Sequence, residues 1–251
     1  PAVRVATACR GRSRRLMSAN ARVIAVFDLD GTITRRDTLF PYVAHYLAQR
    51  PWRLARLLRV LPAACVYVFG GRDRGRLKSA LLRHTLAGEP RTSIEAWNAH
   101  YLPRVIAREL FAQAVASIER HQGNGDTLVL MSASVDLYVP ALARQLGFTH
   151  TICTDVAWRG EVLDGALASA NCRGEEKARR LTGLRERYGD LAIVAYGNSA
   201  SDLPHLRLAT RGVLVNGSRA ARAAAAALGI ESVEWRGTWR PPLRSKLDKL
   251  R

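Results

Sequence analysis

The feature that most constrains the fold is an alternation of short apolar runs with helical patterns. Apolar runs of four to six residues, rich in β-branched side chains, predict buried strands at 23–27, 127–131, 150–154, 191–196 and 212–215. Helical patterns between and after them lie at 135–146, 175–187, 201–209 and 219–228. Strands that alternate with helices of about 10–15 residues form βαβ units. The sequence therefore predicts an α/β fold with a parallel sheet.

Two segments interrupt this alternation. Residues 38–122 contain only helical patterns, among them 40–61, 76–86 and 94–121. A block of this length is too long for a crossover, so we expect a helical cap inserted after the first strand. Residues 156–168 contain two turn signals, Arg159-Gly160 and Asp164-Gly165, and predict a short β-hairpin. The α/β core would then comprise 23–37 and 123–235.

The chain of 251 residues has a formal net charge of +18, which is unevenly distributed. Residues 84–235 balance at 16 basic and 16 acidic side chains, whereas residues 50–83 contain nine basic side chains and one acidic. The two ends, 1–22 and 236–251, are basic tails. We therefore expect any anionic partner to meet the tails and the 50–83 segment.

Composition bounds the class of protein. No apolar run approaches the ~20 residues of a membrane-spanning helix, which excludes a multispan membrane protein. The four cysteines form no C-x-x-C pair, so a reducing compartment fits best and we expect a cytoplasmic location. The Arg-rich start lacks the apolar core of a secretory signal. A transit-like peptide and a start at Met17 both stay open.

Arginine recurs at every third position at the start of the basic cap segment. Arg50, Arg53, Arg56 and Arg59 alternate with leucines, and an apolar stretch follows at 60–71. One interpretation is a cap helix with a solvated basic side. The other is an interfacial element in which Arg pairs with lipid phosphates while the apolar side chains meet the acyl boundary. The second predicts peripheral contact with the inner face of an anionic membrane, through 50–83 and the tails.

The strongest chemical signal follows the first strand, at Phe27-Asp-Leu-Asp-Gly-Thr-Ile-Thr34. Asp28 and Asp30 are two apart, so an extended chain directs both carboxylates the same way. Carboxylates held this close repel each other unless a cation intervenes, and Mg²⁺ both relieves the repulsion and binds phosphate. Gly31 lets backbone N–H groups approach an anion, and Thr32 offers a further donor. The motif predicts a magnesium-dependent phosphate site.

Four motifs in order resemble those of the haloacid dehalogenase (HAD) superfamily of phosphatases. The first is Asp28-Leu-Asp-Gly-Thr32, and the second is the serine of Leu130-Met-Ser132-Ala-Ser134. The third is Lys177 at the start of a helix, and the fourth is the loop Tyr196-Gly-Asn-Ser-Ala-Ser-Asp202. The resemblance covers residues 23 to about 235 and implies a three-layer, Rossmann-like core with a parallel sheet and an inserted cap.

The resemblance also implies a role for each matching residue. Asp28 would be the nucleophile that becomes an aspartyl-phosphate, and Asp30 the general acid and base. Ser132 would hydrogen-bond the phosphoryl group and Lys177 would hold its negative charge. The remaining implied contacts are substrate binding by Gly31, Thr32, Ala133 and Asp37, and Mg²⁺ binding by Asp28, Asp30, Asn198 and Asp202.

One departure from the family pattern concerns the metal. The family commonly has Asp where this chain has Asn198. An Asn oxygen can still bind Mg²⁺ but brings one negative charge fewer, so weaker metal binding or a larger share for Asp202 is expected. A degenerate, non-catalytic member is the alternative.

The inserted cap narrows the range of expected substrates. The helical cap and the hairpin resemble subclass IB, the phosphoserine phosphatase-like branch, which includes C-type phosphatidylglycerophosphatases. Asp37 stands where phosphoserine phosphatases have a Glu that receives the substrate amine, and it follows two Arg, which argues against an amino-acid substrate. We favour a phosphatidylglycerophosphate-like or other membrane phosphomonoester, with phosphoserine and other small phosphomonoesters as alternatives. Nucleic-acid binding is disfavoured, because no such motif occurs and aromatic residues are only 7%.

Overall fold

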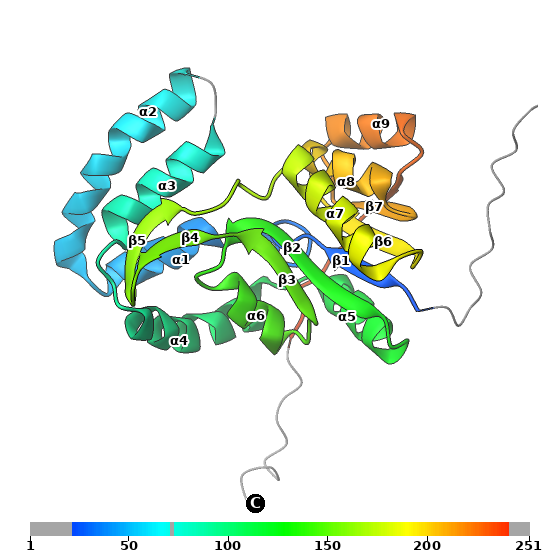
Figure 1. The fold of residues 1–251 in the computed structure, drawn as a ribbon, viewed down its shortest axis with the longest axis horizontal. Helices are drawn as coiled ribbons and strands as arrows, with labels where there is room; N and C mark the ends of the chain where they lie inside the picture. Colours follow the sequence, from blue (N-terminus) through cyan, green and yellow to red (C-terminus); the bar gives the residue numbers. More distant parts are fainter. Residues whose placement is uncertain (1–21, 71–72, 241–251) are drawn as a thin grey trace, which may run out of the picture.

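A single parallel sheet forms the centre of the protein (Figure 1). The structure, a computed structural model, describes residues 22–70 and 73–240. The strand order is β3-β2-β1-β6-β7-β8. The strands are β1 (Ile24–Phe27), β2 (Thr127–Val135), β3 (His150–Thr154), β6 (Ile193–Gly197), β7 (Arg211–Val215) and β8 (Glu231–Val233). The predicted α/β fold with a parallel sheet is confirmed. The edge strand β8 was not predicted, because it is only three residues long and none of them is fully buried.

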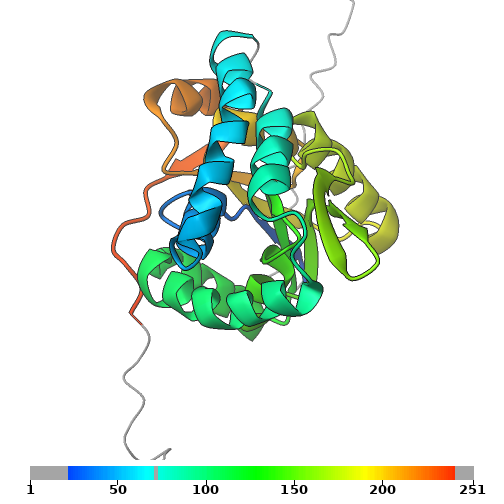
Figure 2. The same ribbon diagram turned by 90° about the vertical axis from the view of Figure 1, so that its left-hand side faces the viewer.

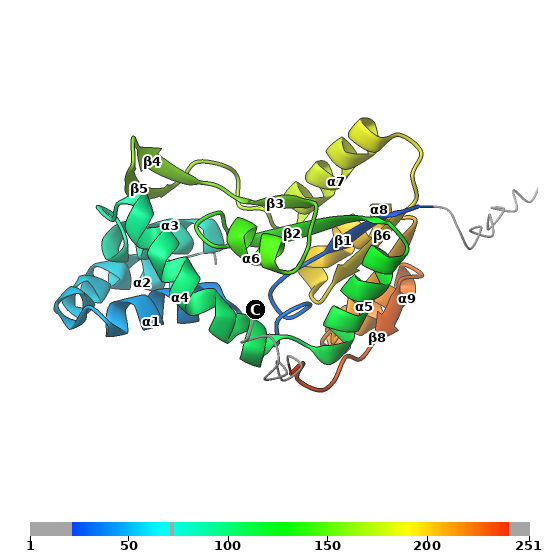
Figure 3. The ribbon, with the colours of Figure 1, turned by 90° about the horizontal axis from the view of Figure 1, so that it is seen from below.

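Helices cover both faces of the sheet, which makes three layers (Figure 3). Alternate residues of β1 point to opposite faces, so Phe27 packs in one apolar cluster and Val26 in the other. The first cluster holds α5 (Ala112–Gly123) and α6 (Val139–Gln145), and the second holds α7 (Glu175–Tyr188), α8 (Leu203–Leu208) and α9 (Arg219–Ala227). Because the strands are buried on both faces, they lack polar alternation, as parallel strands usually do.

The insertion after β1 contains more and shorter helices than expected. They are α1 (Leu39–Ala48), the 3₁₀-helix η1 (Pro51–Val60), α2 (Leu61–Phe69), α3 (Arg74–Thr85) and α4 (Arg91–Glu109), followed by α5. The prediction of a single helix over 40–61 is wrong, because α1 ends before Pro51, whose ring disfavours helical backbone at the preceding residue. The prediction of a single helix over 94–121 is wrong too, because the chain is extended between α4 and α5. Leu110 and Phe111 are extended, and the Phe111 N–H donates to the carbonyl of Ile33 at 3.0 Å.

The last inserted helix packs on the sheet. Helix α5 contacts β2, and the ring of His121 lies edge-on to that of Phe27 with centroids 5.8 Å apart. The division of the chain into core and cap stays a prediction, and on this packing we propose that the cap ends near Leu110 rather than at residue 122.

The predicted hairpin is confirmed as β4 (Val156–Arg159) and β5 (Val162–Leu167), which pair antiparallel. It packs on α3 of the insertion. Gly165 has a φ of +84°, and a Cβ there would lie 2.8 Å from the backbone nitrogen of Arg83, so only glycine permits this approach. The hairpin therefore fixes α3 relative to the sheet. The helix predicted from residue 135 begins at Val139, because β2 continues to Val135.

Membrane-spanning helices and the basic tails were the remaining features considered in the sequence. Within residues 22–70 and 73–240, no helix is long and apolar enough to cross a membrane. Nearly all of the basic N-terminal tail, with Met17, and residues 241–251 of the C-terminal tail lie outside the described part of the chain.

Candidate active site

The carboxyl ends of three neighbouring strands bring the family motifs together. Phe27 at the end of β1 pairs with Leu130 of β2 on one side and Tyr196 of β6 on the other. The residues that follow each of them therefore lie at one edge of the sheet: Asp28 after β1, Ser132 on β2 and Asn198 after β6. This edge is where open α/β sheets place their binding sites.

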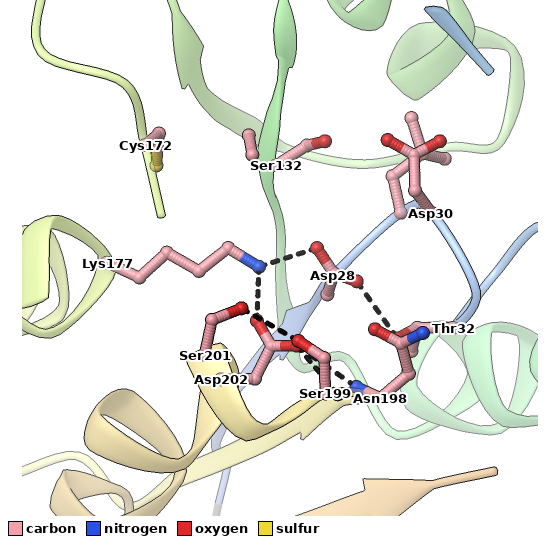
Figure 4. A network of polar contacts seen from close by, with 12 residues as sticks. Asp28, Asp30, Thr32, Ser132, Cys172, Lys177, Asn198, Ser199, Ser201 and Asp202 are labelled. Atoms are coloured by element: carbon pink, nitrogen blue, oxygen red, sulfur yellow. Dashed lines mark hydrogen bonds and ion pairs between the residues drawn. The ribbon is translucent and has the colours of Figure 1, made fainter. Parts of the chain in front are cut away.

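A buried lysine joins two of the predicted carboxylates (Figure 4). Lys177 lies in the first turns of α7, and its Nζ is 2.5 Å from an oxygen of Asp28 and 2.7 Å from an oxygen of Asp202. Burial alone would lower the pKa of Lys177, but the two carboxylates outweigh it and hold that pKa well above its usual value. The lysine therefore stays protonated and supplies a fixed positive charge beside Asp28.

Asp202 is held from both of its oxygens. Oδ1 accepts from Lys177, while Oδ2 accepts from the Ser199 hydroxyl at 2.7 Å and from the backbone N–H groups of Ser199 and Asn198 at 3.0 and 3.2 Å. Burial alone would raise the pKa of Asp202. Lys177, His205 and the Ser199 hydrogen bond outweigh burial and hold that pKa below its usual value, so the carboxyl stays ionised. With both oxygens engaged, Asp202 is placed to orient Lys177 and the loop that carries Asn198.

Asp28 is buried, and its side chain accepts a hydrogen bond from Thr32 as well as from the lysine. The Thr32 hydroxyl donates to its Oδ2 at 3.0 Å, and Thr32 itself is fully buried. Burial raises the pKa of Asp28 to about 7; Lys177 opposes this shift and Asp202 adds to it. A further cation beside Asp28 would favour its ionised form. Thr32, predicted to bind substrate, instead contacts the carboxylate of Asp28.

Asp30 has separate contacts, away from the lysine. The Ser134 hydroxyl donates to one oxygen at 2.6 Å, and the Thr38 hydroxyl and N–H donate to the other at 2.7 and 2.8 Å. Burial and the charge of Asp37 raise its pKa above the usual value, although these hydrogen bonds oppose the shift. A carboxyl with a raised pKa at a defined position is suited to proton transfer.

Asn198 lies against the glycine of the first motif. Gly31 has a φ of +82°, and a Cβ on it would collide with the Asn198 side chain. Figure 4 shows the amide of Asn198 extending toward Asp28. Among the described residues, no three His, Cys, Asp or Glu side chains converge as a metal site. The oxygen donors that could hold Mg²⁺ are a mixed set: the Asp28 carboxylate, the Asn198 amide oxygen and the Asp30 backbone carbonyl. All are hard oxygen ligands, so the set fits Mg²⁺ with a low ligand charge.

A cavity of about 410 Å³ opens over these groups. Among the predicted residues, its lining includes Asp28, Asp30, Gly31, Asp37, Ala133, Lys177, Asn198 and Asp202. Thr32 and Ser132 lie just behind it and are fully buried; the Ser132 hydroxyl accepts from the N–H of Ser134 at 3.0 Å. Asp37 also accepts from the N–H groups of Leu39 and Phe40, so it caps α1 while facing the cavity.

The cavity also contains cations, and of these the sequence pointed only to the two arginines before Asp37. Lys78 on α3 donates from its Nζ to the carbonyl of Ala133 and, at 2.8 Å, to the side chain of Asn171. Burial lowers the pKa of Lys78 to about 8, against the opposing charges of Asp30 and Asp37. Four arginines join it in the lining: Arg35, Arg36, Arg74 and Arg173. Lys78 and Arg74 are separated from the motifs by about 50 residues of chain, so no local pattern points to them.

Three residues near the motifs had non-catalytic interpretations. His205 is buried, with its Nδ1 4.0 Å from Asp202, because α8 packs its inner side against the sheet. Asp136 accepts from the N–H of Val156 at 3.1 Å and so joins the end of β2 to the start of β4. Cys172 is buried, and burial raises the pKa of its thiol to about 11, so it stays protonated.

Known proteins with similar sequences include one that is named a probable phosphatase. Residues 25–207 match the signature of haloacid dehalogenase-like hydrolases. The protein CicA of Caulobacter vibrioides is 34% identical over 194 residues, covering 74% of this chain and 83% of its own. A probable phosphatase of Mycobacterium tuberculosis is 28% identical over 213 residues, covering 83% of this chain and 74% of its own.

Solved structures agree with the fold. A Bordetella pertussis protein of unknown function superposes with a TM-score of 0.71 at 25% identity, covering 85% of this chain and 98% of its own. A phosphoserine phosphatase, solved as an analogue of its phospho-aspartyl intermediate, gives a TM-score of 0.56 at 15% identity, covering 81% and 90%. The signature covers well over half of the chain and includes the cluster around Asp28 and Lys177, so this protein belongs to the haloacid dehalogenase-like hydrolase family.

Proposed function

We propose that this HAD-type phosphatase hydrolyses a phosphomonoester through an aspartyl-phosphate on Asp28. The observation that supports the proposal most is the pairing of two differently held carboxyls at one cavity. Burial raises the pKa of both carboxyls, but their contacts differ: Asp28 lies against the charge of Lys177, whereas Asp30 is held by neutral donors. Environments that separate two neighbouring carboxyls in this way assign one as nucleophile and the other as acid.

In the first step, a carboxylate oxygen of Asp28 attacks phosphorus and the bond from phosphorus to the ester oxygen breaks. The electron pair goes to the leaving oxygen, which takes the proton of Asp30. Lys177 holds charge that develops on the phosphoryl and nucleophile oxygens, and it needs little reorganisation because Asp202 already fixes it. Ser134 and Thr38 keep the Asp30 carboxyl at a set orientation throughout.

In the second step, Asp30 acts in the opposite direction. Now ionised, it takes a proton from a water molecule whose oxygen attacks the phosphorus of the aspartyl-phosphate. The bond between phosphorus and Asp28 breaks, which releases inorganic phosphate and restores the Asp28 carboxylate. The same residue serves both steps, because each step leaves it in the protonation state that the other requires.

Mg²⁺ would be held by Asp28, Asn198 and the Asp30 carbonyl. When bound, it neutralises charge on the phosphate oxygens and favours the ionised form of Asp28. Asp202 contributes indirectly, since both of its oxygens contact other groups of the protein.

For the substrate, we propose a membrane or lipid phosphomonoester, such as a phosphatidylglycerophosphate-like compound. The excess of cations around the cavity supports it, because Arg35, Arg74 and Lys78 exceed what one phosphoryl group requires and suit a second anionic group. Peripheral contact with an anionic membrane belongs to the same proposal.

Phosphoserine is the second candidate, supported by the phosphoserine phosphatases among the structures with this fold. Asp37 is the acidic group available for its amine, but one of its oxygens already caps α1, and Arg35 and Arg36 flank the same cavity. These neighbours favour an anion over an ammonium group.

A phosphate-release assay at fixed Mg²⁺ tests both levels of the proposal. The panel contains p-nitrophenyl phosphate, phosphoserine, lysophosphatidate and phosphatidylglycerophosphate. We expect hydrolysis of the aryl phosphate and the highest kcat/KM on a lipid phosphate, with all activity lost in Asp28→Asn. Activity that survives Asp28→Asn contradicts the mechanism, and a preference for phosphoserine contradicts only the substrate class.

A further inference from the structure

The 3₁₀-helix η1 has its charged side toward the protein and its apolar sides toward solvent. A 3₁₀-helix has three residues per turn, so residues three apart stack along one edge. Arg50, Arg53 and Arg56 form the half-buried edge. Arg50 stacks on the ring of Tyr46 at 4.0 Å, and Arg53 forms an ion pair with Glu89. For Arg50 and Arg53, the interpretation of a solvated basic side is therefore wrong, and so is the interpretation in which these arginines pair with lipid phosphates, because both side chains are engaged within the protein.

The other two edges of η1 expose large apolar side chains. Trp52 is 73% exposed and Leu58 67%, on the edge that continues to Leu61 at the start of α2. Helix α2 then has no buried residue at all, and Phe69 at its end is 87% exposed. The exposed large apolar residues of this segment are Trp52, Leu54, Leu57, Leu58, Leu61, Val66, Val68 and Phe69. We call these eight side chains the η1–α2 apolar surface.

We propose that the η1–α2 apolar surface docks onto the surface of an anionic lipid membrane. Contiguous exposed apolar surface of this kind marks an interaction site. An aromatic and aliphatic patch with basic side chains around it is typical of elements that lie in the membrane interface. Arg59 and Arg76 flank the patch; residues 38–72 contain no acidic residue, and Asp73 lines the same groove as Arg76.

The charge around the patch favours a lipid surface over a second copy of the chain. A symmetric dimer through this surface would bring the exposed side chains of Arg59 and Arg76 from both copies to one interface. Like charges across an interface are unfavourable. Anionic head groups complement the same charge, and the acyl boundary accepts Trp52, Leu58 and Phe69. Figures 1 and 2 place α2 at the outer margin of the insertion, where a flat surface can reach it.

The patch lies close to the catalytic cavity. A groove between α2 and α3 is lined by Val66, Tyr67 and Arg76, whereas Arg74 and Lys78, from the same first turns of α3, line the cavity over Asp28. Docking would therefore hold the cavity mouth near lipid head groups. The delivery of a lipid substrate to the cavity rests on the proposed function, but the binding of the η1–α2 apolar surface to a membrane does not.

Sedimentation of the full-length protein with vesicles tests the inference. The vesicles contain phosphatidylcholine alone or with phosphatidylglycerol, at 0.1 and 0.5 M NaCl. The test variant is Leu58→Ser with Phe69→Ser. The matched control is Leu208→Ser with Leu228→Ser, which removes two exposed leucines elsewhere. The basic tails are intact in all variants, so any difference comes from the apolar surface. Far-UV circular dichroism and the thermal unfolding midpoint check that each variant folds, whether or not it is active.

We expect the wild type and the control to bind the anionic vesicles, and binding by the test variant to fall at least 10-fold at 0.5 M NaCl, where screening weakens the tails. Equal binding by the test variant and wild type, or no binding by the wild type, overturns the inference. So does a wild-type dimer in solution that the test variant converts to a monomer, because a second copy then covers the surface. Binding that persists in a protein inactive on every phosphate ester contradicts the proposed function and leaves the docking intact.

Discussion

At the scale of single residues, the site separates two carboxyls that stand two positions apart. Asp28 contacts a permanent cation, whereas Asp30 contacts two hydroxyls and an N–H. The sequence motif places both at the end of β1, but the different roles proposed for them depend on Lys177, Ser134 and Thr38, which come from other elements. The chemistry of each carboxyl is therefore assigned by its neighbours rather than by its place in the motif.

Asp30→Asn tests the division of roles. The variant cannot protonate a leaving oxygen, so we expect kcat/KM for an alkyl phosphate to fall by about 10²–10⁴. For p-nitrophenyl phosphate, whose leaving group needs no proton, kcat/KM should fall far less. Because the variant also lacks the base of the second step, p-nitrophenolate should appear as a stoichiometric burst. Equal losses of kcat/KM on both esters would contradict the role of Asp30 as acid.

Asn198→Asp tests the metal donors. The substitution adds one negative charge beside Asp28, and ligand charge sets the affinity of oxygen sites for divalent cations. We expect Mg²⁺ to bind about 10-fold more tightly, measured by titration calorimetry and by protection against thermal unfolding. Asn124→Asp, at the exposed end of α5, adds the same charge away from the site and should change neither quantity. An unchanged affinity in Asn198→Asp would remove Asn198 from the metal site.

At the scale of elements, α3 carries cap side chains into the cavity, and its first turn is held by a single cap. The Asp73 side chain accepts from the N–H groups of Gly75 and Arg76, at 2.8 and 3.1 Å. The turn that it closes holds Arg74, and Lys78 follows one turn later. Helix stability and substrate binding are therefore coupled in α3.

Asp73→Ala should lower the free energy of unfolding by about 1 kcal/mol, because two helix N–H groups lose their acceptor. Urea denaturation measures this loss, and we also expect KM to rise because Arg74 and Lys78 are less firmly positioned. Ser218→Ala removes the corresponding cap of α9, far from the cavity, and should cost similar stability with no change in KM. Equal KM values for Asp73→Ala and the wild type would separate α3 from substrate binding.

At the scale of the whole molecule, Lys78 links the insertion to the sheet. It lies on α3 but donates to Ala133 on β2, and it is buried enough to have a pKa of about 8. The positive charge of Lys78 is consequently present below about pH 8 and lost above it, whereas Arg74 on the same helix keeps its charge.

A pH profile of KM tests this link. Between pH 7 and 9.5, Lys78 loses its proton and the cavity loses one cation, so KM for a dianionic substrate should rise by about 10-fold, the value of one charge-assisted contact. Lys78→Arg keeps its charge over this range, so its KM should stay level. A rise of the same size in Lys78→Arg would assign the titration to another group.

Sequence and tertiary structure determined different properties of this protein. Local patterns were enough for the parallel strands, the hairpin and the four motifs, because strand burial and backbone turns are encoded within a few residues. The long helix predicted over 40–61 failed at Pro51, and β8 was too short to register.

The chain alone predicted that Asp28 and Asp202 would share one edge of a sheet, because parallel strands end on the same side, and the motif resemblance added Lys177 to them. Only the tertiary structure decided which groups surround them. Lys78 reaches the cavity because the β4–β5 hairpin fixes α3, and His205 is buried because α8 packs on the sheet. The same holds for η1, because a repeat of arginine every third residue does not say which side of the helix faces the protein. Arg50 and Arg53 face inward because Tyr46 and Glu89 lie there to receive them, whereas Arg59 is exposed.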